Sequence, residues 1–313
     1  MIAILQIVLP VFLVVGAGFA AVRLFGFERS AVDGLMAFAV RFAVPILLFG
    51  KVARLDLARS FDPGLLLAFY AGAWICFATG VALARSRFAR RPGEAVAIGF
   101  SALFSNTLLL GLPILTRAYG EAETAAAVAI IAVHAPTNYL LGIVTMEIAR
   151  RDGAPPLETA RKTIRAIFSN ALALGIGAGL ALNLSGLAMP GFVADAVDMI
   201  ATAALPAALF GLGGALTRHR LRSDLREAGL IAALSTLLHP LIALILGLIL
   251  GLPDSFLRAA VILAAMPTGM NGYVFAAQYR RAEGACASGV LLGTAAAVAT
   301  ASLWLWLLGV IAP

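Results

Sequence analysis

The chain has few charged residues, few histidines and almost no cysteine. Only 12% of its 313 residues are charged and only three are histidine, whereas 62% are hydrophobic. A soluble domain of this length does not need so large an apolar fraction, so the sequence predicts a chain embedded in a lipid bilayer. The two cysteines, Cys76 and Cys286, lie in apolar runs without disulfide or metal-site spacing. We expect both to be small buried hydrophobic residues, and we expect no metal and no cofactor.

Apolar runs of about twenty residues recur along the chain, the length that crosses about 30 Å of hydrocarbon as a helix. Transmembrane β-strands would be about half as long and would alternate polar with apolar residues. The sequence therefore predicts an all-α membrane protein. Its ten expected spans lie near residues 2–23, 31–51, 64–84, 94–118, 124–148, 166–187, 191–216, 228–251, 255–279 and 285–310.

The basic residues gather in alternate loops between these spans. Of the 23 Lys and Arg residues, 17 lie in the loops after the odd-numbered spans, five lie on the opposite side, and Arg41 lies within a span. By the positive-inside rule the richer side is cytoplasmic, so both termini are expected outside the cell inner membrane. The net charge of +7 is thus explained by membrane topology, and we expect the lipid bilayer as a partner and no nucleic acid.

Two stretches of the chain recur at the same offset of 161 residues. Residues 15–20 (VGAGFA) match 176–181 (IGAGLA), and 43–50 (AVPILLFG) match 204–211 (ALPAALFG). Each half holds five expected spans, so the second half must be inverted relative to the first. The predicted organisation is a first repeat over 1–149, a cytoplasmic linker over 150–165 and a second repeat over 166–313. Inverted repeats with a site at the membrane midplane are typical of secondary transporters.

The fourth and ninth spans each contain residues that interrupt a helix. The fourth holds Asn106, Gly111 and Pro113, and the ninth holds Pro267, Gly269 and Asn271 within a few positions. Proline removes a backbone donor, glycine lowers the cost of unwinding, and freed backbone groups at membrane depth need protein or water to satisfy them. Interruptions at corresponding places in two repeats predict a transport site.

Three stretches resemble the auxin efflux carrier family, which includes plant PIN-type carriers and bacterial permeases linked to malate and malonate. They are 42–49 (FAVPILLF), 106–114 (NTLLLGLPI), and MPTG at 266–269 followed by YVFAAQY at 273–279. The resemblance covers nearly the whole chain and implies a scaffold domain and a transport domain that move in an elevator-like cycle. It also implies a homodimer, and an organic-anion substrate held near the two interruptions.

We combine the interruptions and the resemblance into one candidate substrate site. The expected substrate is a small mono- or dicarboxylate such as malonate or malate, or an auxin-like acid. Half-helix N-termini present unpaired N–H groups to a carboxylate. The candidate residues are Asn106, Gly111, Pro113, Asn138, Tyr139, Pro267, Asn271, Tyr273 and Arg41.

The role of the intramembrane polar residues is left open. Arg41 is a counter-charge for an anion, a member of a structural ion pair with Asp198 or Asp195, or a side chain that snorkels through a kink at Pro45. His134 and His239 either carry a proton in a coupled cycle or are neutral rings hydrogen-bonded to carbonyls of a broken helix.

Other functions remain as alternatives to an organic-anion transporter. A sodium-coupled carrier similar to bile-acid symporters is one, although no acidic residue lies in the middle of the fourth or ninth span. An intramembrane enzyme would need a convergent nucleophile and base or a metal cluster. Neither the metal motif His-Glu-x-x-His nor the nucleophile motif Gly-x-Ser-x-Gly occurs in the sequence, so no enzyme is expected. A channel would show polar rings rather than paired interruptions, and a non-transporting membrane subunit is the last alternative.

Overall fold

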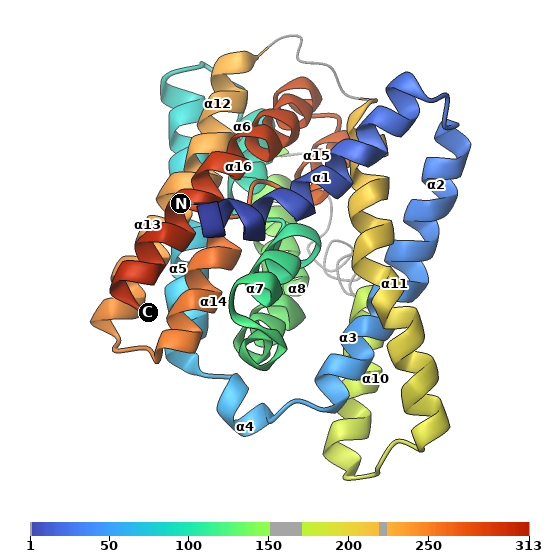
Figure 1. Ribbon diagram of the computed structural model, residues 1–313. Helices are drawn as coiled ribbons and strands as arrows, with labels where there is room; N and C mark the ends of the chain where they lie inside the picture. The colour runs from blue at the N-terminus through green and yellow to red at the C-terminus, as the bar shows by residue number, and fades with distance from the viewer. Residues whose placement is uncertain (1, 151–170, 219–223, 313) are drawn as a thin grey trace. The chain divides into compact units, whose positions relative to one another are not determined.

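The computed structural model describes residues 2–150, 171–218 and 224–312, which fold as helices joined by short loops (Figure 1). Among these residues the one β-type pairing is a bridge between Ser105 and Thr268. The helical elements, with three π-helical turns and one 3-10 turn marked η, are α1 (Ile2–Leu24), α2 (Arg29–Phe38), η1 (Ala39–Ala43), α3 (Val44–Ala53), α4 (Leu57–Ser60), α5 (Pro63–Ser86), α6 (Pro92–Leu103), η2 (Thr107–Gly111), α7 (Leu112–Tyr119), η3 (Glu121–Thr124), α8 (Ala125–Arg150), α10 (Ala171–Ser185), α11 (Gly191–Leu216), α12 (Leu225–Ala233), η4 (Leu234–Leu238), α13 (His239–Ile249), α14 (Asp254–Ala264), α15 (Met270–Tyr279) and α16 (Glu283–Ile311).

Seven helices in the described part of the chain are long and apolar enough to cross a membrane. They cover Ile4–Leu24, Arg29–Ala53, Pro63–Ser86, Ala125–Ala149, Gly191–Leu216, Leu225–Ile249 and Glu283–Ile311. Seven of the ten expected spans therefore correspond to unbroken helices. The expected spans at 94–118 and 255–279 are each interrupted, and of the sixth only α10 is described. Apart from Arg150, the expected linker lies outside the described residues.

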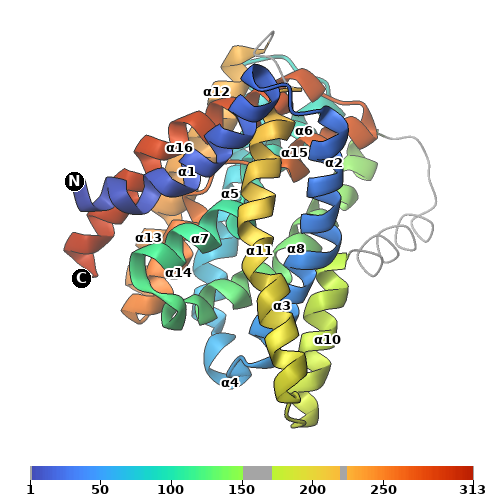
Figure 2. The same cartoon turned by 45° about the vertical axis from the view of Figure 1, so that its right-hand side comes forward.

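The chain divides into two compact units, and each takes residues from both halves of the sequence. The first unit comprises Met1–Leu9, Phe61–Thr163 and His219–Pro313, and the second comprises Pro10–Ser60 and Ile164–Arg218. Within the second unit, α11 runs beside α2 and α3 in both views (Figures 1 and 2). The expected interruptions all belong to the first unit.

In the second unit, two helix pairs approach closely at glycine. A Cβ added to Gly18 of α1 would lie 1.9 Å from the carbonyl oxygen of Phe210 in α11, and one added to Gly179 of α10 would lie 2.7 Å from the carbonyl oxygen of Phe49 in α3. Gly18 and Gly179 are related by the 161-residue offset, as are Phe49 and Phe210. Positions that match in sequence thus make matching contacts.

Each of the three π-helical turns precedes a proline by two residues. Pro45 follows η1, Pro113 follows η2, and Pro240 follows η4. A proline ring clashes with the carbonyl four residues earlier and offers no N–H, and a wider turn relieves the clash. Pro136 and Pro206, by contrast, lie inside helices assigned as continuous α-helix.

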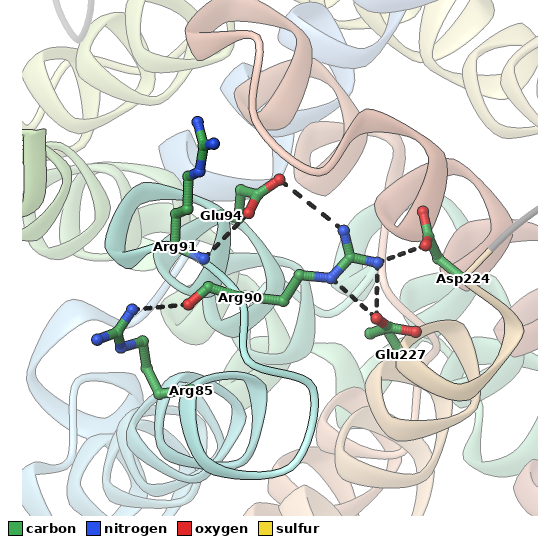
Figure 3. A network of polar contacts seen from close by, with 6 residues as sticks. All are labelled: Arg85, Arg90, Arg91, Glu94, Asp224 and Glu227. Atoms are coloured by element: carbon green, nitrogen blue, oxygen red, sulfur yellow. Dashed lines mark hydrogen bonds and ion pairs between the residues drawn. The ribbon is translucent and has the colours of Figure 1, made fainter.

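An ion-pair network in the first unit joins the loop before α6 to the start of α12 (Figure 3). Nε of Arg90 donates to Oε1 of Glu227 at 2.9 Å, the same guanidinium binds Asp224, and Glu94 lies 3.8 Å away. Burial lowers the pKa of Arg90, but the hydrogen bonds to Glu227 and Asp224 outweigh it and raise the pKa above its usual value. The network fixes two segments far apart in sequence.

Candidate functional site

The two interrupted helices of the first unit meet at their interruptions. The amide of Asn106 donates to the carbonyl of Pro267 at 2.8 Å, and the amide of Gly269 donates to the carbonyl of Phe104 at 2.9 Å. These two bonds flank the bridge between Ser105 and Thr268. Backbone groups released by one helix therefore pair with groups released by the other, which satisfies them at membrane depth. We call residues 104–106 and 265–269 the crossing.

Local sequence explains why the helices stop at the crossing. Phe104 and Asn106 have ψ values of 78° and 58°, which end the helical path of α6. Pro267 has no amide hydrogen to continue α14, and Gly269 adopts an extended conformation before α15 begins at Met270. The interruptions expected in the fourth and ninth spans are thus confirmed, with α6 ending at Leu103 and α14 at Ala264.

Ser105, inside the crossing, is held by a buried histidine. Its hydroxyl oxygen lies 3.1 Å from Nδ1 of His239, and Nε2 of the same ring lies 3.0 Å from the carbonyl oxygen of Phe69 in α5. Both His239 and Ser105 are buried. Gly72 makes room for the ring, since a Cβ there would lie 2.8 Å from Cδ2 of His239. His239 thus connects the crossing to a continuous helix, and its carbonyl partner belongs to α5 rather than to an interrupted helix.

The second histidine, His134 of α8, also packs against Phe69, with ring centroids 5.6 Å apart. Nδ2 of Asn138 lies 3.2 Å from Nδ1 of His134, while Oδ1 of this fully buried asparagine has no hydrogen-bond partner among the described residues. The His134 ring packs edge-on against Phe104, with ring centroids 4.8 Å apart. An unpaired buried amide oxygen next to the crossing is a group that a bound water or ligand would satisfy.

Three of the candidate residues lie at or against the crossing. Asn106 and Pro267 are bonded directly through their backbones. Gly111, the last residue of η2, packs close to Met266, because an added Cβ would lie 3.1 Å from Cγ of that side chain. Pro113 follows in the first turn of α7 and is buried. It shapes the π-helical turn after the crossing rather than the crossing itself.

The remaining candidates of the first unit flank the crossing. The ring of Tyr139 packs on Phe104 and Phe100, at centroid distances of 5.5 and 5.4 Å. Asn271 and Tyr273 belong to the first turn of α15, where Asn271 is exposed and Tyr273 half-buried. Together with Asn138, these side chains come from two helices, α8 and α15.

Arg41 lies in the second unit, unlike the other candidates. It occupies η1, and its side chain is exposed. Asp198, one of the two ion-pair partners considered from sequence, instead binds Arg54 through two hydrogen bonds of 2.8 and 3.1 Å. The pairing of Arg41 with Asp198 is therefore wrong, because a bidentate guanidinium already holds that carboxylate.

Sequence reasoning missed Ser105 and Thr268, which form the bridge, and it did not connect His239 to the crossing. A signal was present for both bridge residues, because each adjoins a residue that was selected, Asn106 or Pro267. The rule that freed backbone groups must pair would have identified them as partners once the two interruptions were assumed to meet.

The crossing carries no charged side chain in either segment. Its electrostatic character comes from the backbone, because η2 and α15 both begin there and the first N–H groups of a helix carry partial positive charge. Such an arrangement can receive an anion without placing a fixed cation in the membrane.

Seven membrane-length apolar helices, together with two interrupted helices that pair through their backbones, define a multi-pass membrane transporter. Comparison with known proteins agrees, because the family model described as "Membrane transport protein" matches residues 3–305. The chain therefore belongs to this family, the auxin efflux carrier family that its motifs resemble. It is a membrane transporter and not an enzyme.

Named relatives fall into a bacterial and a plant group. A Rhizobium meliloti (strain 1021) protein named "Putative malonate transporter" is 26% identical over 304 residues, covering 96% of this chain and 95% of the relative. "Auxin efflux carrier component 1" of Arabidopsis thaliana is 30% identical over 151 residues, which cover 48% of this chain and 24% of that protein. "Probable auxin efflux carrier component 9" of Oryza sativa subsp. japonica is 27% identical over 110 residues, covering 34% and 26%.

Proposed function

We propose that the chain is a secondary transporter of small organic anions, with mono- or dicarboxylates such as malonate as substrates. The observation that carries the proposal is the crossing, where two interrupted helices pair through Asn106 and Pro267 and start new helical segments. A carboxylate binds favourably to helix N-termini. Because the crossing has no charged side chain, the empty carrier can return across the membrane without moving a buried charge. The name of the Rhizobium relative supports malonate as the first substrate to test.

We propose that Asn106, Asn138 and Asn271 supply amide groups to the substrate, while Tyr139 and Tyr273 line the site. The unpartnered Oδ1 of Asn138 supports this assignment. Gly111, Pro113 and Pro267 act through the backbone, by allowing the interruption and the turn that follows it. Arg41 is assigned a lesser part, as an intramembrane counter-charge for the anionic substrate.

We also propose that the chain holds ten spans in two inverted repeats, 1–149 and 166–313, joined by the linker 150–165. The equivalent contacts of Gly18 and Gly179 support a twofold relation between the halves. Two compact units, with the crossing in one of them, support an elevator-type cycle in which the first unit moves and the second serves as scaffold. The distribution of basic residues supports a location in the bacterial inner membrane with both termini outside. A homodimer through the second unit completes the proposal.

Flux in proteoliposomes tests the function. Purified protein is reconstituted, and uptake of radiolabelled malonate, malate, succinate and indole-3-acetate is measured with and without an imposed pH gradient. We expect saturable uptake of at least one anion. In Asn106→Ala, uptake should fall to the level of protein-free liposomes, because the variant loses an amide at the crossing.

A matched control separates the site from general damage to the protein. Gln278 is an exposed amide near the end of α15, and Gln278→Ala should transport as the unaltered protein does. Size-exclusion chromatography in detergent verifies that all variants are folded. Normal uptake by a folded Asn106→Ala would refute the site, and absence of flux for every anion would refute the substrate class.

A further inference from the structure

We propose that His239 binds a proton that is transported together with the organic anion, and that Ser105 relays its protonation state to the crossing. This inference rests on the proposed function and adds the coupling ion to it. It is carried by one chain of contacts, from the carbonyl of Phe69 through both nitrogens of His239 to the Ser105 hydroxyl.

The contacts fix the tautomer of the neutral ring. A carbonyl oxygen can only accept, so Nε2 of His239 carries a hydrogen and donates to Phe69. Nδ1 is then an acceptor, and the Ser105 hydroxyl donates to it. In this state the one hydrogen of the Ser105 hydroxyl is committed to the histidine.

Protonation of His239 reverses the bond to Ser105. A proton taken from water by Nδ1 makes the ring a donor at both nitrogens, so the Ser105 oxygen must become the acceptor. The hydroxyl hydrogen of Ser105 is then free to donate to another group. Ser105 lies between Phe104 and Asn106, whose backbone groups hold the crossing together. One proton on His239 therefore adds one hydrogen-bond donor at the crossing.

The groups that face His239 provide no counter-ion for an imidazolium. Helices α5 and α14 pack on α13, and the arginine of α14, Arg258, bonds to the carbonyl of Ala312 at 3.2 Å and pairs with Glu123 at 3.9 Å. Phe69 packs against both histidines, with ring centroids 4.8 Å from His239 and 5.6 Å from His134. The other titratable side chains of α5 bond elsewhere, since the Tyr70 hydroxyl donates to Ile130 and the Cys76 thiol donates to Leu234. Among the described residues, no carboxylate forms an ion pair with His239.

A substrate carboxylate would supply the missing negative charge. An isolated cation in a fully buried position is costly, and an anion bound at the adjacent crossing lowers that cost. Thermodynamic linkage makes the effect reciprocal, so a proton on His239 also strengthens binding of the anion. One proton and one anion then enter the site from the same side and leave it together on the other.

Proton uptake on binding is the direct test, with malonate as the probe. Isothermal titration calorimetry of the purified protein is run in two buffers of different ionisation enthalpy, at a mildly alkaline pH where malonate is a dianion. We expect uptake of about one proton per malonate, and a malonate Kd that rises about tenfold per unit of pH. His239→Gln, which can still donate to Phe69 but cannot titrate, should bind malonate with no uptake and no such dependence.

The chain has only three histidines, which gives a complementary variant. The double variant His134→Gln/His219→Gln leaves His239 as the sole histidine and should still take up about one proton per malonate. This result supports the proposal even where His239→Gln does not fold. Malonate binding by the unaltered protein without proton uptake would overturn the proposal and leave the proposed function intact. So would loss of uptake in the double variant. Absence of both binding and flux for every anion would overturn the proposed function, and the coupling with it.

Discussion

Glycine serves different purposes in the two compact units. In the second unit, Gly18 and Gly179 lie within continuous helices, where the missing side chain lets a neighbouring backbone approach. In the first unit, Gly269 lies where the helix has ended, and its amide bonds to Phe104 across the crossing. In the second unit, glycine allows two helices to pack closely. In the first unit, the glycine amide pairs with a carbonyl that is left free where a helix ends. The comparison teaches that glycine content alone does not distinguish packing from unwinding in a membrane chain.

The largest effect is expected where a side chain would meet backbone in the second unit. In Gly18→Ala the new Cβ would lie 1.9 Å from the carbonyl oxygen of Phe210. Neither helix can yield without separating, so we expect a loss of roughly 3 kcal/mol or more in stability. Thermal unfolding of the detergent-solubilised protein measures it.

Gly16→Ala, on the same helix, is the control. Among the described residues, no atom outside the local backbone of α1 lies within 4 Å of the position its Cβ would take. Alanine should therefore be neutral or stabilising by up to about 1 kcal/mol. Equal melting temperatures for the two variants would show that α1 and α11 do not pack as described.

A smaller effect is expected at Gly272 of α15, which packs against Thr268 of the crossing. In Gly272→Ala the Cβ would lie 2.8 Å from the hydroxyl oxygens of Ser101 and Thr268, both buried. The hydroxyl groups can rotate, but Cα of Ser101 also lies 3.1 Å away and must shift slightly. We therefore expect a loss of about 1–3 kcal/mol together with impaired malonate flux. Unfolding and proteoliposome uptake are measured on the same preparation.

Gly269→Ala is the control for Gly272→Ala. Its Cβ would lie 3.6 Å from Asn106 at the closest, an ordinary contact, and the residue has a φ of −79° that alanine adopts freely. Its stability should match that of the unaltered protein. A Gly269→Ala variant as unstable as Gly272→Ala would contradict the described geometry of the crossing.

The sequence predicted the interruptions at Asn106 and Pro267 because proline, glycine and asparagine act locally on the backbone. It also predicted burial of Cys76 and Cys286, which is confirmed. The bridge between Ser105 and Thr268 was not predicted, because it depends on how distant segments meet. Local rules likewise did not separate Pro45 and Pro240, which follow π-helical turns, from Pro206, which does not. Residue propensity predicts where a helix is perturbed, and tertiary packing determines whether that position becomes an interruption, a π-helical turn or a continuous helix.

Effects of similar or smaller size are expected from the ion pairs, and these also differ between the units. Arg90 in the first unit is about one-fifth exposed and holds Glu227, which is 9% exposed, whereas Arg54 in the second unit is about half exposed and pairs with Asp198. Arg90→Gln leaves a buried carboxylate without its partner, so we expect a loss of about 1–3 kcal/mol.

Arg54→Gln should cost no more than about 1 kcal/mol, because water replaces the lost hydrogen bonds at an exposed site. The hydrogen bond to Asp198 raises the pKa of Arg54, but solvent and salt screen the charges around it. Thermal unfolding at low and high ionic strength separates the two cases: the small Arg54 effect should vanish in salt, whereas most of the Arg90 effect should persist. An equal loss for both variants, equally sensitive to salt, would show that the Arg90 network is as open to solvent as the Arg54 pair.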